Sequence, residues 1–391
     1  MSDLLRLPFE RTSVLEISAT YAALRTKEPI ARVRTRTGDE AWLVTGYEQA
    51  RAIFADERFG RAHSDPDQAA RLSNSALTGG PSGEFATEKD VHDRMRRLLA
   101  PAFSARRMQA LSGRVQELVD GLLDRMQERG PPLDLHASLS VPLPIQVICE
   151  LLGVPLADRD HFRAIAEEMT DLADPGRSAA ARTAMEEYSH GIVMAKRDEP
   201  GEDVYSDLAT ADLPADEVAT IAGGLLFAGH ETTVNRIDHG VLLLLANPAQ
   251  LAALKRDPAL APAAVEEIMR VAVPNDHGLG RYAREDVEVD GVTIRAGELC
   301  VIMPAAANRD ESVFTDPERF DIGREAQPHL GFGYAIRYCL GASLARVELR
   351  AVFGSLFQRF PGLRLAVPLD RLPQRVDRLT GGFSALPVTW R

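Results

Sequence analysis

Cysteine is scarce in this chain of 391 residues, which contains only Cys149, Cys300 and Cys339. Three widely separated cysteines do not make a disulfide framework, and they fit a reducing compartment. An excess of positive charge is also lacking, because 45 basic residues stand against 57 acidic ones, for a net charge of −12. This balance argues against nucleic acid as the main partner.

Long hydrophobic runs are absent as well. The uncharged segments 218–229 and 241–246 fall well short of the ~20 residues that a membrane helix needs. The first residues, MSDLLRLPFERTS, carry charges from the third position on and lack the pattern of a signal peptide. We therefore expect a cytoplasmic protein without a membrane anchor.

Most of the remaining sequence has the hydrophobic period of helices. Clear examples are residues 93–103, 108–127 and 262–272. We find no internal repeat and no low-complexity linker. The sequence therefore predicts a mainly α-helical fold with a minor β region, arranged as a single domain over residues 1–391.

Two segments predict β-hairpins. Residues 29–47 alternate around the turn Thr37-Gly38-Asp39, and residues 287–294 surround Asp290-Gly291, a strong signal for a two-residue turn. Residues 78–84, TGGPSGE, have the composition of a loop.

One predicted helix is unusually long and runs from about Pro214 to Asn247. Proline in the first turn, followed by two acidic residues, is typical of a helix N-terminus. About 33 residues at 1.5 Å each span roughly 50 Å, which crosses a whole domain. Its middle contains glycines and the polar stretch Glu231-Thr232-Thr233, which is costly in a buried helix unless the polar groups find partners. Tight helix packing with one satisfied Glu explains this stretch as well as a functional role does.

Cys339 lies between a glycine-rich turn and a helix-like run, in GFGYAIRYCLGASLAR at residues 331–346. A position just before a helix lowers the pKa of a thiol, because the helix N-terminus favours the thiolate. Phe332 and Gly333 would let the backbone approach a flat ligand and shield the sulfur. Arg337, two residues before the cysteine, would meet an anion on the same side.

Several roles for Cys339 compete. A buried, inert cysteine in a capping turn is the commonest fate of a lone cysteine. A redox pair is excluded because no second cysteine is near, and zinc is disfavoured for the same reason. A nucleophilic cysteine would need a histidine base, which the local sequence leaves open. A single thiolate as the axial ligand of haem iron fits best, because one cysteine is all that it needs.

The stretch PHLGFGYAIRYCLGASLARVE, residues 328–348, resembles the haem-binding signature of the cytochrome P450 family. Further segments resemble motifs of this family, in the same order along residues 5–390. These segments are HDRMRRLLAPAFSARR (92–107), AGHETT (228–233), EIMR (267–270), GRYAREDVEVDGVTIRAGE (280–298), ANRD (307–310) and FTDPERFD (314–321). The chain is most similar to the soluble bacterial members.

The resemblance implies a fold, a cofactor and a reaction. The fold would be a triangular helical prism that holds haem b, iron protoporphyrin IX, between the long central helix and the helix after the cysteine loop. The activity would be that of a monooxygenase with O₂ as co-substrate. Electrons from NAD(P)H would arrive through ferredoxin reductase and ferredoxin, and the enzyme would be a monomer.

The resemblance also implies roles for particular residues. Cys339 would be the thiolate ligand of the iron, and Glu231 and Thr232 would deliver protons for O₂ cleavage, with Gly229 letting the helix open. Glu267 and Arg270 would pair with Arg319 and stabilise the core. The haem would contact the following residues: His92, Arg96, Ala228, Arg281, Phe332, Gly333, Arg337 and Gly341.

Substrate contacts are expected from five regions. These regions are the loop 62–88, the helices near 164–195, and the segments 222–232, 273–279 and 380–384. The individual residues expected to contact the substrate are Ala222, Val273, Asn275, His277, Leu279 and Phe383. The polar stretch 273–278 fits a polar natural product as well as it fits a solvated turn.

Two positions depart from the family pattern. The usual second glycine of the cysteine loop is Ala335 here, and since alanine disfavours positive φ, we expect the local turn to differ slightly. The stretch EKDVH, residues 88–92, lacks the prolines that the family often has before the histidine.

A ferredoxin would dock on the face that carries the cysteine loop. This face is expected to contain the cations Arg96, Arg97, Arg106, Arg107, Arg337, Arg346 and Arg350. A basic face would attract an acidic partner despite the net acidity of the chain.

Three functions remain open on the sequence. The first is hydroxylation or epoxidation of a small organic substrate in bacterial secondary metabolism. The second is oxidative C–C or C–N coupling of an aromatic substrate without oxygen insertion. The third is a haem sensor or carrier without turnover, which the intact Glu231-Thr232 pair disfavours.

Overall fold

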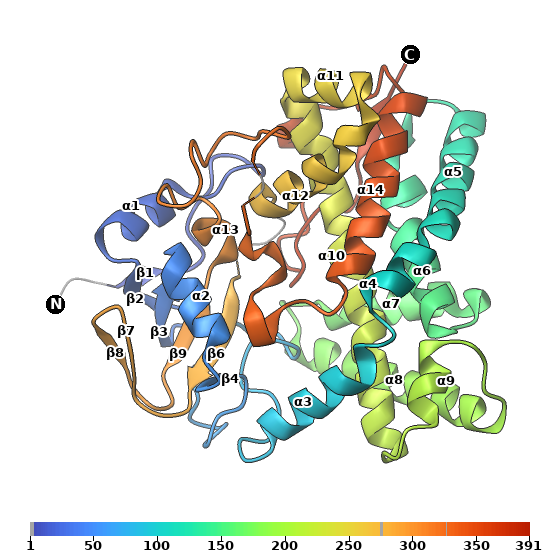
Figure 1. The fold of residues 1–391 in the computed structure, drawn as a ribbon. Helices are drawn as coiled ribbons and strands as arrows, with labels where there is room; N and C mark the ends of the chain where they lie inside the picture. Colours follow the sequence, from blue (N-terminus) through green and yellow to red (C-terminus); the bar gives the residue numbers. More distant parts are fainter. Residues whose placement is uncertain (1–3, 274–276, 326) are drawn as a thin grey trace. The chain divides into compact units, whose positions relative to one another are not determined.

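The computed structural model describes residues 4–273, 277–325 and 327–391. Contacts divide the chain into two compact units, one of residues 1–94 and 266–339, the other of residues 95–265 and 340–391. The mainly helical prediction is confirmed, and the strands form a six-stranded, a three-stranded and a two-stranded sheet among the described residues. Figure 1 shows the elements along the chain.

The first unit is built around the six-stranded sheet, ordered β1-β2-β3-β9-β6-β4. Segments far apart in the sequence pair here, because β3 runs parallel to β9 and β9 antiparallel to β6 (Figure 1). The strands are β1 (Leu5–Arg6), β2 (Ile30–Arg34), β3 (Glu40–Val44), β4 (Phe59–Gly60), β6 (Leu279–Ala283) and β9 (Leu299–Ile302). The helices of this unit are α1 (Ala19–Lys27), α2 (Tyr47–Ala55) and α13 (Pro304–Ala307), with short 3-10 turns at Leu330–Phe332 and Ala335–Arg337.

Both faces of this sheet are buried. Neighbouring side chains point to opposite faces of a strand, so Leu43 and Val301 enter one hydrophobic cluster while Val44 and Ile302 enter the other. The continuous apolar run of β9, LCVI, follows from this double burial.

Both predicted hairpins are confirmed. β2 pairs antiparallel with β3 in full register, from Ile30 opposite Val44 to Arg34 opposite Glu40. The second hairpin joins β7 (Val287–Val289) to β8 (Val292–Ile294). Its turn residues Asp290 and Gly291 have φ values of 49° and 76°, the two positive values that a tight hairpin turn of this type requires.

The second unit is a helical assembly around α10 (Ala215–Ala246), 32 residues long. The predicted long helix is confirmed, with Pro214 and Asn247 as its caps. Helices α6, α8, α9, α11 and α14 and the π-helical turn η1 pack against α10. The elements of this unit are α4 (Ala105–Ala110), α5 (Ser112–Arg129), η1 (His136–Ser140), α6 (Pro142–Leu152), α7 (Arg159–Met169), α8 (Pro175–Asp198), α9 (Val204–Ala209), α10, α11 (Pro248–Arg256), α14 (Ala342–Arg359) and the sheet of β5 (Leu133–Asp134), β10 (Arg364–Leu365) and β11 (Pro387–Thr389).

Two helical predictions need correction. α3 (Glu88–Leu99) stops at Leu99, short of residue 103, because Pro101 cannot continue the helix. The segment 108–127 is interrupted at Leu111, which separates α4 from α5. α12 (Ala261–Val271) matches its prediction to within one residue at each end.

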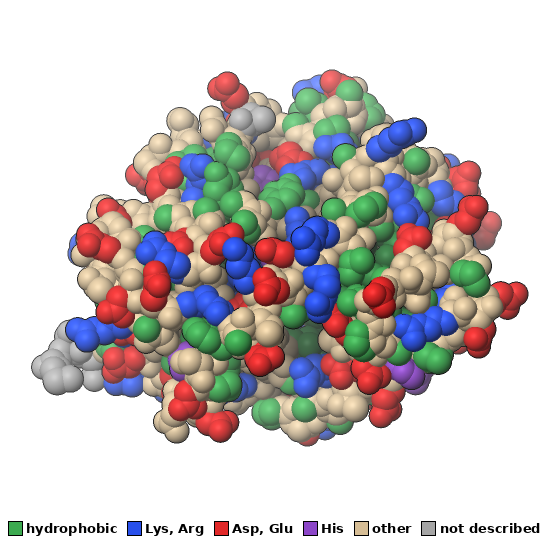
Figure 2. Space-filling view, turned by 60° about the horizontal axis from the view of Figure 1, so that its bottom comes forward, with side chains coloured by type: hydrophobic (Ala, Val, Ile, Leu, Met, Phe, Trp, Pro, Cys, Tyr) green, Lys and Arg blue, Asp and Glu red, His purple; other side chains and the backbone are tan. Residues whose placement is uncertain are grey.

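No single helix of the described residues is both long and apolar enough to cross a membrane. The bent pair α10 and α11 passes that test by length and composition only, with an angle of 105° between the two helices. On the face shown in Figure 2, basic and acidic side chains are interspersed.

Candidate active site

The cysteine loop is held in place by two glycines that no other residue can replace. A Cβ atom on Gly331 would lie 2.5 Å from the carbonyl oxygen of Met269, and one on Gly333 would lie 2.6 Å from that of Arg337. Gly333 also has a φ of 73°, which favours glycine. The backbone N–H of Cys339 donates to the carbonyl of Phe332 across 2.7 Å and closes the loop. This geometry leaves the Cys339 side chain exposed.

The sequence predicts a slightly altered turn at Ala335. In the structure Ala335 has a φ of 49°, within the left-handed region that costs an L-residue free energy. Ala335 therefore has a backbone conformation that suits glycine, and this conformation is strained for alanine. Gly341 has an ordinary φ of −83° and precedes α14 as its N-cap, with open space where a Cβ atom would lie.

Two of the predicted cofactor-binding arginines lie together in the first unit. Arg281 is on β6 and Arg337 ends the turn Ala335–Arg337, and the Nε atoms of both are buried without a hydrogen-bond partner among the described residues. Burial, followed by repulsion from Arg337 and Arg61, lowers the pKa of Arg281 to about 9. Burial also lowers the pKa of Arg61, which is therefore a third member of this group.

The carboxylate of Glu88 lies beside this cluster of arginines and pairs with it. It lies 3.6 Å from Arg337 and 3.2 Å from Arg284, and it accepts hydrogen bonds from the backbone N–H groups of Arg61 and Ala62. Three buried guanidinium groups around one shared carboxylate leave positive charge uncompensated. The cluster of Arg61, Arg281 and Arg337 therefore suits a further anion. Arg61 was not among the predicted residues, because it belongs to none of the motifs found in the sequence.

His92 and Arg96 are four residues apart on α3 and therefore share one helix face. The Nδ1 atom of His92 lies 3.4 Å from the neighbouring carboxylate of Asp93, and its side chain is 20% exposed. Both residues are partly buried. Their assignment to the cofactor stays a prediction.

Glu231 is buried in the middle of α10 and is held by the C-terminal segment. Its Oε2 atom accepts a hydrogen bond from the hydroxyl of Thr380 at 2.9 Å and lies 3.4 Å from Nη1 of Arg375. The other end of Arg375 lies 3.6 Å from the carboxylate of Glu167, which is half exposed. Polar groups thus run from the buried acid to an acid at the surface.

The segment that carries Thr380 is docked tightly on α10. The side chain of Asn235 donates to the carbonyl of Thr380 across 3.0 Å. A Cβ atom on Gly382 would overlap the side chain of Asn235, and Gly382 has a φ of 84°. The sequence predicts substrate contacts from the turn 380–384, but it does not predict the contacts of Thr380 and Arg375 with Glu231. The adjacent glycines Gly381 and Gly382 were the local signal of a close backbone approach.

Thr232 points away from the Glu231 network, because neighbouring residues of a helix are rotated by about 100°. Its hydroxyl donates to the carbonyl of Ala228 across 3.0 Å, and its side chain is exposed. The residues of the predicted pair therefore have separate surroundings, one buried and charged, the other open.

The opening of α10 at Gly229 stays a prediction, and in this structure the helix is unbroken from Ala215 to Ala246. Gly229 also serves packing, because a Cβ atom there would lie 2.6 Å from Cδ1 of Ile148 on α6. The next residue, His230, is buried against Phe162 with a ring separation of 5.6 Å. Burial lowers the pKa of His230 to about 4, so this side chain is neutral near neutral pH.

Glu267 and Arg270 form the predicted buried pair on α12. Arg270 donates to both carboxylate oxygens of Glu267, each at 2.8 Å. The expectation for Arg319 is wrong: its side chain is 60% exposed and lies near Asp321, while only its backbone carbonyl accepts from Arg270. Arg324, five residues later, supplies the second cation, with Nε 3.3 Å from Glu267.

The predicted substrate contacts are mostly buried. Ala222 is 0% and Phe383 is 1% exposed, and Phe383 packs against His239, so a substrate contact at these two positions stays a prediction. Val273 and His277 are buried as well. Leu279 is 40% exposed and remains a candidate, whereas Asn275 lies outside the described residues.

Comparison with known proteins identifies the family. The cytochrome P450 family model matches residues 192–371. Pentalenolactone synthase of Streptomyces exfoliatus is 42% identical over 401 aligned positions, with 100% of each chain covered. The chain belongs to the cytochrome P450 family. Nocardicin C N-oxygenase of Nocardia uniformis subsp. tsuyamanensis is 42% identical and matches over 100% of this chain and 99% of its own.

The fold agrees with this assignment. The crystal structure of the LnmA cytochrome P450 hydroxylase, from the leinamycin biosynthetic pathway of Streptomyces atroolivaceus S-140, superposes with a TM-score of 0.88. It is 40% identical, and the match covers 99% of this chain and 100% of that one. The P450 chain described here is therefore an oxidoreductase of a family that uses haem iron and O₂.

The described residues fit a haem group. Haem iron in this family needs one thiolate, and Cys339 is exposed in a rigid loop. Haem also carries two carboxylates, and Arg281 and Arg337 have buried Nε atoms without a partner among the described residues. Charge and donor type therefore agree with the group that the family binds.

Proposed function

We propose that this P450 is a haem-thiolate monooxygenase that oxidises a small organic molecule of bacterial secondary metabolism. The observation that carries the proposal is the glycine-locked loop that presents Cys339, together with the anion-deficient cluster of Arg61, Arg281 and Arg337 in the same unit. The similarity to a pentalenolactone synthase, an N-oxygenase and a hydroxylase supports oxidation in a natural-product pathway.

Cys339 would hold the iron as a thiolate, and Arg281 and Arg337, with Arg61, would bind the haem carboxylates. Guanidinium groups suit this task because they donate two parallel hydrogen bonds to a carboxylate. His92 and Arg96 on α3 remain candidates for the same carboxylates. When bound, the haem supplies the oxygen-activating chemistry, which a thiolate ligand promotes.

Glu231 and Thr232 would handle the protons that O₂ cleavage consumes. Arg375 lies between the carboxylate of Glu231 and the half-exposed carboxylate of Glu167. Its guanidinium keeps its own proton, so it orients Glu231 and does not itself relay protons. Thr232 has an exposed hydroxyl that can hold a water molecule or donate its own proton. His230 is excluded as a proton donor near neutral pH, because burial lowers its pKa to about 4 and leaves it without the extra proton.

We further propose a ferredoxin, reduced by NAD(P)H through a reductase, as the electron donor of a monomeric cytoplasmic enzyme. Cys149, Cys300 and Cys339 form no disulfide with one another, which suits a reducing compartment. Arg337 is removed from the expected docking face, because its side chain is only 12% exposed and lies beside Glu88. Arg107 is partly neutralised by Asp207, 3.3 Å away.

The first experiment is the optical spectrum of the reduced protein with carbon monoxide. Wild type and the matched variant Cys149→Ala are expected to show the strongly red-shifted Soret band of a thiolate-bound haem, and Cys339→Ala is expected to lose it. The same band in Cys339→Ala would show that Cys339 is not the ligand of the iron. A folded wild-type protein that takes up no haem would overturn the proposal.

A second experiment tests turnover with a ferredoxin system and a substrate found by screening. In Thr232→Ala, product formation is expected to fall by about a hundredfold, while NAD(P)H oxidation continues and releases peroxide or water. Thr220→Ala is the control, because the Thr220 hydroxyl likewise bonds to a carbonyl of its own helix, at 2.9 Å. If Thr232→Ala forms as much product per NAD(P)H oxidised as wild type does, Thr232 has no role in proton delivery.

The mass of the product separates the remaining possibilities. Insertion adds one oxygen atom to the substrate, whereas oxidative coupling removes two hydrogen atoms. A haem sensor would give a normal carbon monoxide spectrum and no product with any substrate.

A further inference from the structure

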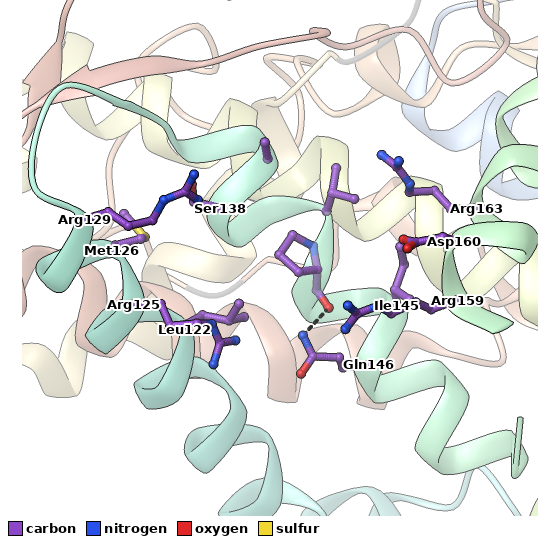
Figure 3. Close-up of a pocket in the computed structure, with 13 residues that line it drawn as sticks. Leu122, Arg125, Met126, Arg129, Ser138, Ile145, Gln146, Arg159, Asp160 and Arg163 are labelled. Carbon is purple, nitrogen blue, oxygen red and sulfur yellow. Dashed lines mark hydrogen bonds between the residues drawn. The ribbon is translucent and has the colours of Figure 1, made fainter. Parts of the chain in front are cut away.

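A cavity of about 540 Å³ opens on the second unit, between α5, α7 and the segment of η1 and α6 (Figure 3). It is lined by residues of all four elements. The volume falls within the ~300–1,000 Å³ of typical small-molecule sites. The cavity is large enough for a ligand the size of a nucleotide or a cofactor fragment.

The lining is strongly basic. It contains Arg125 and Arg129 from α5 and Arg159 and Arg163 from α7, against the single acid Asp160. None of these four arginines makes an ion pair or a side-chain hydrogen bond to a residue that the structure describes. Acidic residues outnumber basic ones in the whole chain, 57 to 45, so composition alone would not produce such a cluster.

The arginines come in two pairs with the same spacing. Arg125 and Arg129 are four residues apart, and so are Arg159 and Arg163, which places each pair on one face of its helix. Figure 3 shows the α5 pair on one side of the cavity and the α7 pair on the other. Like charges at this spacing destabilise a helix. Both unfavourable pairs border the same cavity, where an anion between them would relieve the repulsion.

Three apolar residues of the lining are buried. Leu122, Met126 and Ile145 are at most 4% exposed and offer a ligand little surface. The four arginines are all exposed. Recognition in this cavity therefore depends on their charge.

We propose that this cavity binds a small molecule that carries several phosphate groups, with these groups between the two arginine pairs. Phosphate is favoured as the anion because its three oxygens can accept from several guanidinium groups at once. The site is separate from the residues assigned to catalysis, and the proposal stands or falls independently of the haem chemistry.

Calorimetric titration of the haem-loaded protein tests the proposal with three probes, which are ATP, tripolyphosphate and citrate. ATP and tripolyphosphate are both expected to bind with one-to-one stoichiometry, because each carries a chain of three phosphates. Citrate is expected to bind more weakly than either. Absence of ATP binding, or citrate as the tightest ligand, would overturn the phosphate assignment.

Single variants locate the site. Arg129→Gln and Arg163→Gln, one from each helix, are each expected to weaken ATP binding by about tenfold or more. Asp160→Asn is expected to strengthen it, because one negative charge leaves the lining. The control is Arg182→Gln, which changes the charge equally at an exposed position of α8 outside the cavity. Equal weakening in the control would show that ATP binds through the net charge of the protein and not at this cavity.

An acidic protein partner is the competing occupant. If Arg129→Gln and Arg163→Gln leave ATP binding unchanged but slow haem reduction by ferredoxin relative to Arg182→Gln, the cavity is a docking surface and the small-molecule proposal fails. Both measurements are therefore made on each variant. Unchanged reduction together with weakened ATP binding supports the small-molecule site.

Discussion

The hydroxyl of Thr380 donates a hydrogen bond to Oε2 of Glu231 across 2.9 Å, and through it the C-terminal segment controls a buried acid 149 positions earlier in the chain. Arg375 approaches the same oxygen at 3.4 Å. A buried carboxylate needs such partners, because an unpaired charge in the interior is costly. The orientation of Glu231 is thus set by residues far from α10 in sequence.

Replacing Thr380 with valine tests this control. The substitution keeps the shape of the side chain and removes the hydroxyl, so we expect the free energy of unfolding to fall by about 1–3 kcal/mol. Turnover is expected to slow as well, because Glu231 loses its fixed position. Urea denaturation and product formation measure the two effects. Thr220→Val, which removes an exposed hydroxyl from α10, is expected to change neither. Wild-type turnover in Thr380→Val would show that Glu231 needs no such support.

Arg281→Leu should have opposite effects with and without haem. In the haem-free protein the variant removes a buried guanidinium that burial and two neighbouring arginines disfavour, so stability is expected to rise by about 1 kcal/mol. In the loaded protein the same variant loses a partner of a haem carboxylate, and haem affinity is expected to fall at least about tenfold.

Haem titration and denaturation of both forms measure these changes. Arg295→Leu is the control, because Arg295 is an exposed arginine of the same unit. A haem affinity equal to that of wild type would remove Arg281 from the cofactor site, whatever its effect on the haem-free protein.

Locally determined structure could be predicted from the sequence. The Asp290-Gly291 turn and the caps of α10 depend on a few neighbouring residues, and both match the structure. Contacts with a partner from elsewhere in the chain could not be predicted in this way. Arg319 and Arg324 are only five residues apart, so the sequence does not show which of them contacts Glu267. The folded backbone brings Arg324 to Glu267 and leaves Arg319 beside Asp321.

Burial of the predicted substrate residues was equally hard to foresee. Ala222 lies on a helix that is buried on most of its faces, and its apolar side chain gives no sign of whether a ligand or α8 covers it. Arg61 was missed because a single arginine in a loop has no pattern, although its burial lowers its pKa beside Arg337.

Ala335→Gly is expected to stabilise the protein by about 0.5–1 kcal/mol. The left-handed conformation, with φ at 49°, costs alanine about 1–2 kcal/mol, and glycine removes this cost. Glycine is also more flexible in the unfolded chain, which offsets part of the gain. Thermal denaturation measures the change. Ala179→Gly, in an exposed turn of α8, is expected to do the opposite, since glycine is unfavourable in a helix. Destabilisation by Ala335→Gly would show that the loop gains more from the methyl group than it loses in strain.

The buried pair of His136 and Asp238 should make stability depend on pH. Their side chains are 2.7 Å apart, and Asp238 is 0% exposed. Burial lowers the pKa of His136, but the hydrogen bond and charge of Asp238 outweigh it, and the pKa in the folded protein is raised. A raised histidine pKa stabilises fully below the unfolded value of about 6.5, and this contribution is lost as the pH rises through the folded value.

The free energy of unfolding is therefore expected to decrease as the pH rises above about 6.5. Urea denaturation at a series of pH values measures this slope for wild type. Asp238→Asn is expected to flatten the slope and to cost more stability at low pH than at high pH, because only the protonated histidine needs the carboxylate. His161→Gln, which removes an exposed histidine of α7, is expected to keep the wild-type slope. A slope that survives in Asp238→Asn would assign the pH dependence to groups other than this pair.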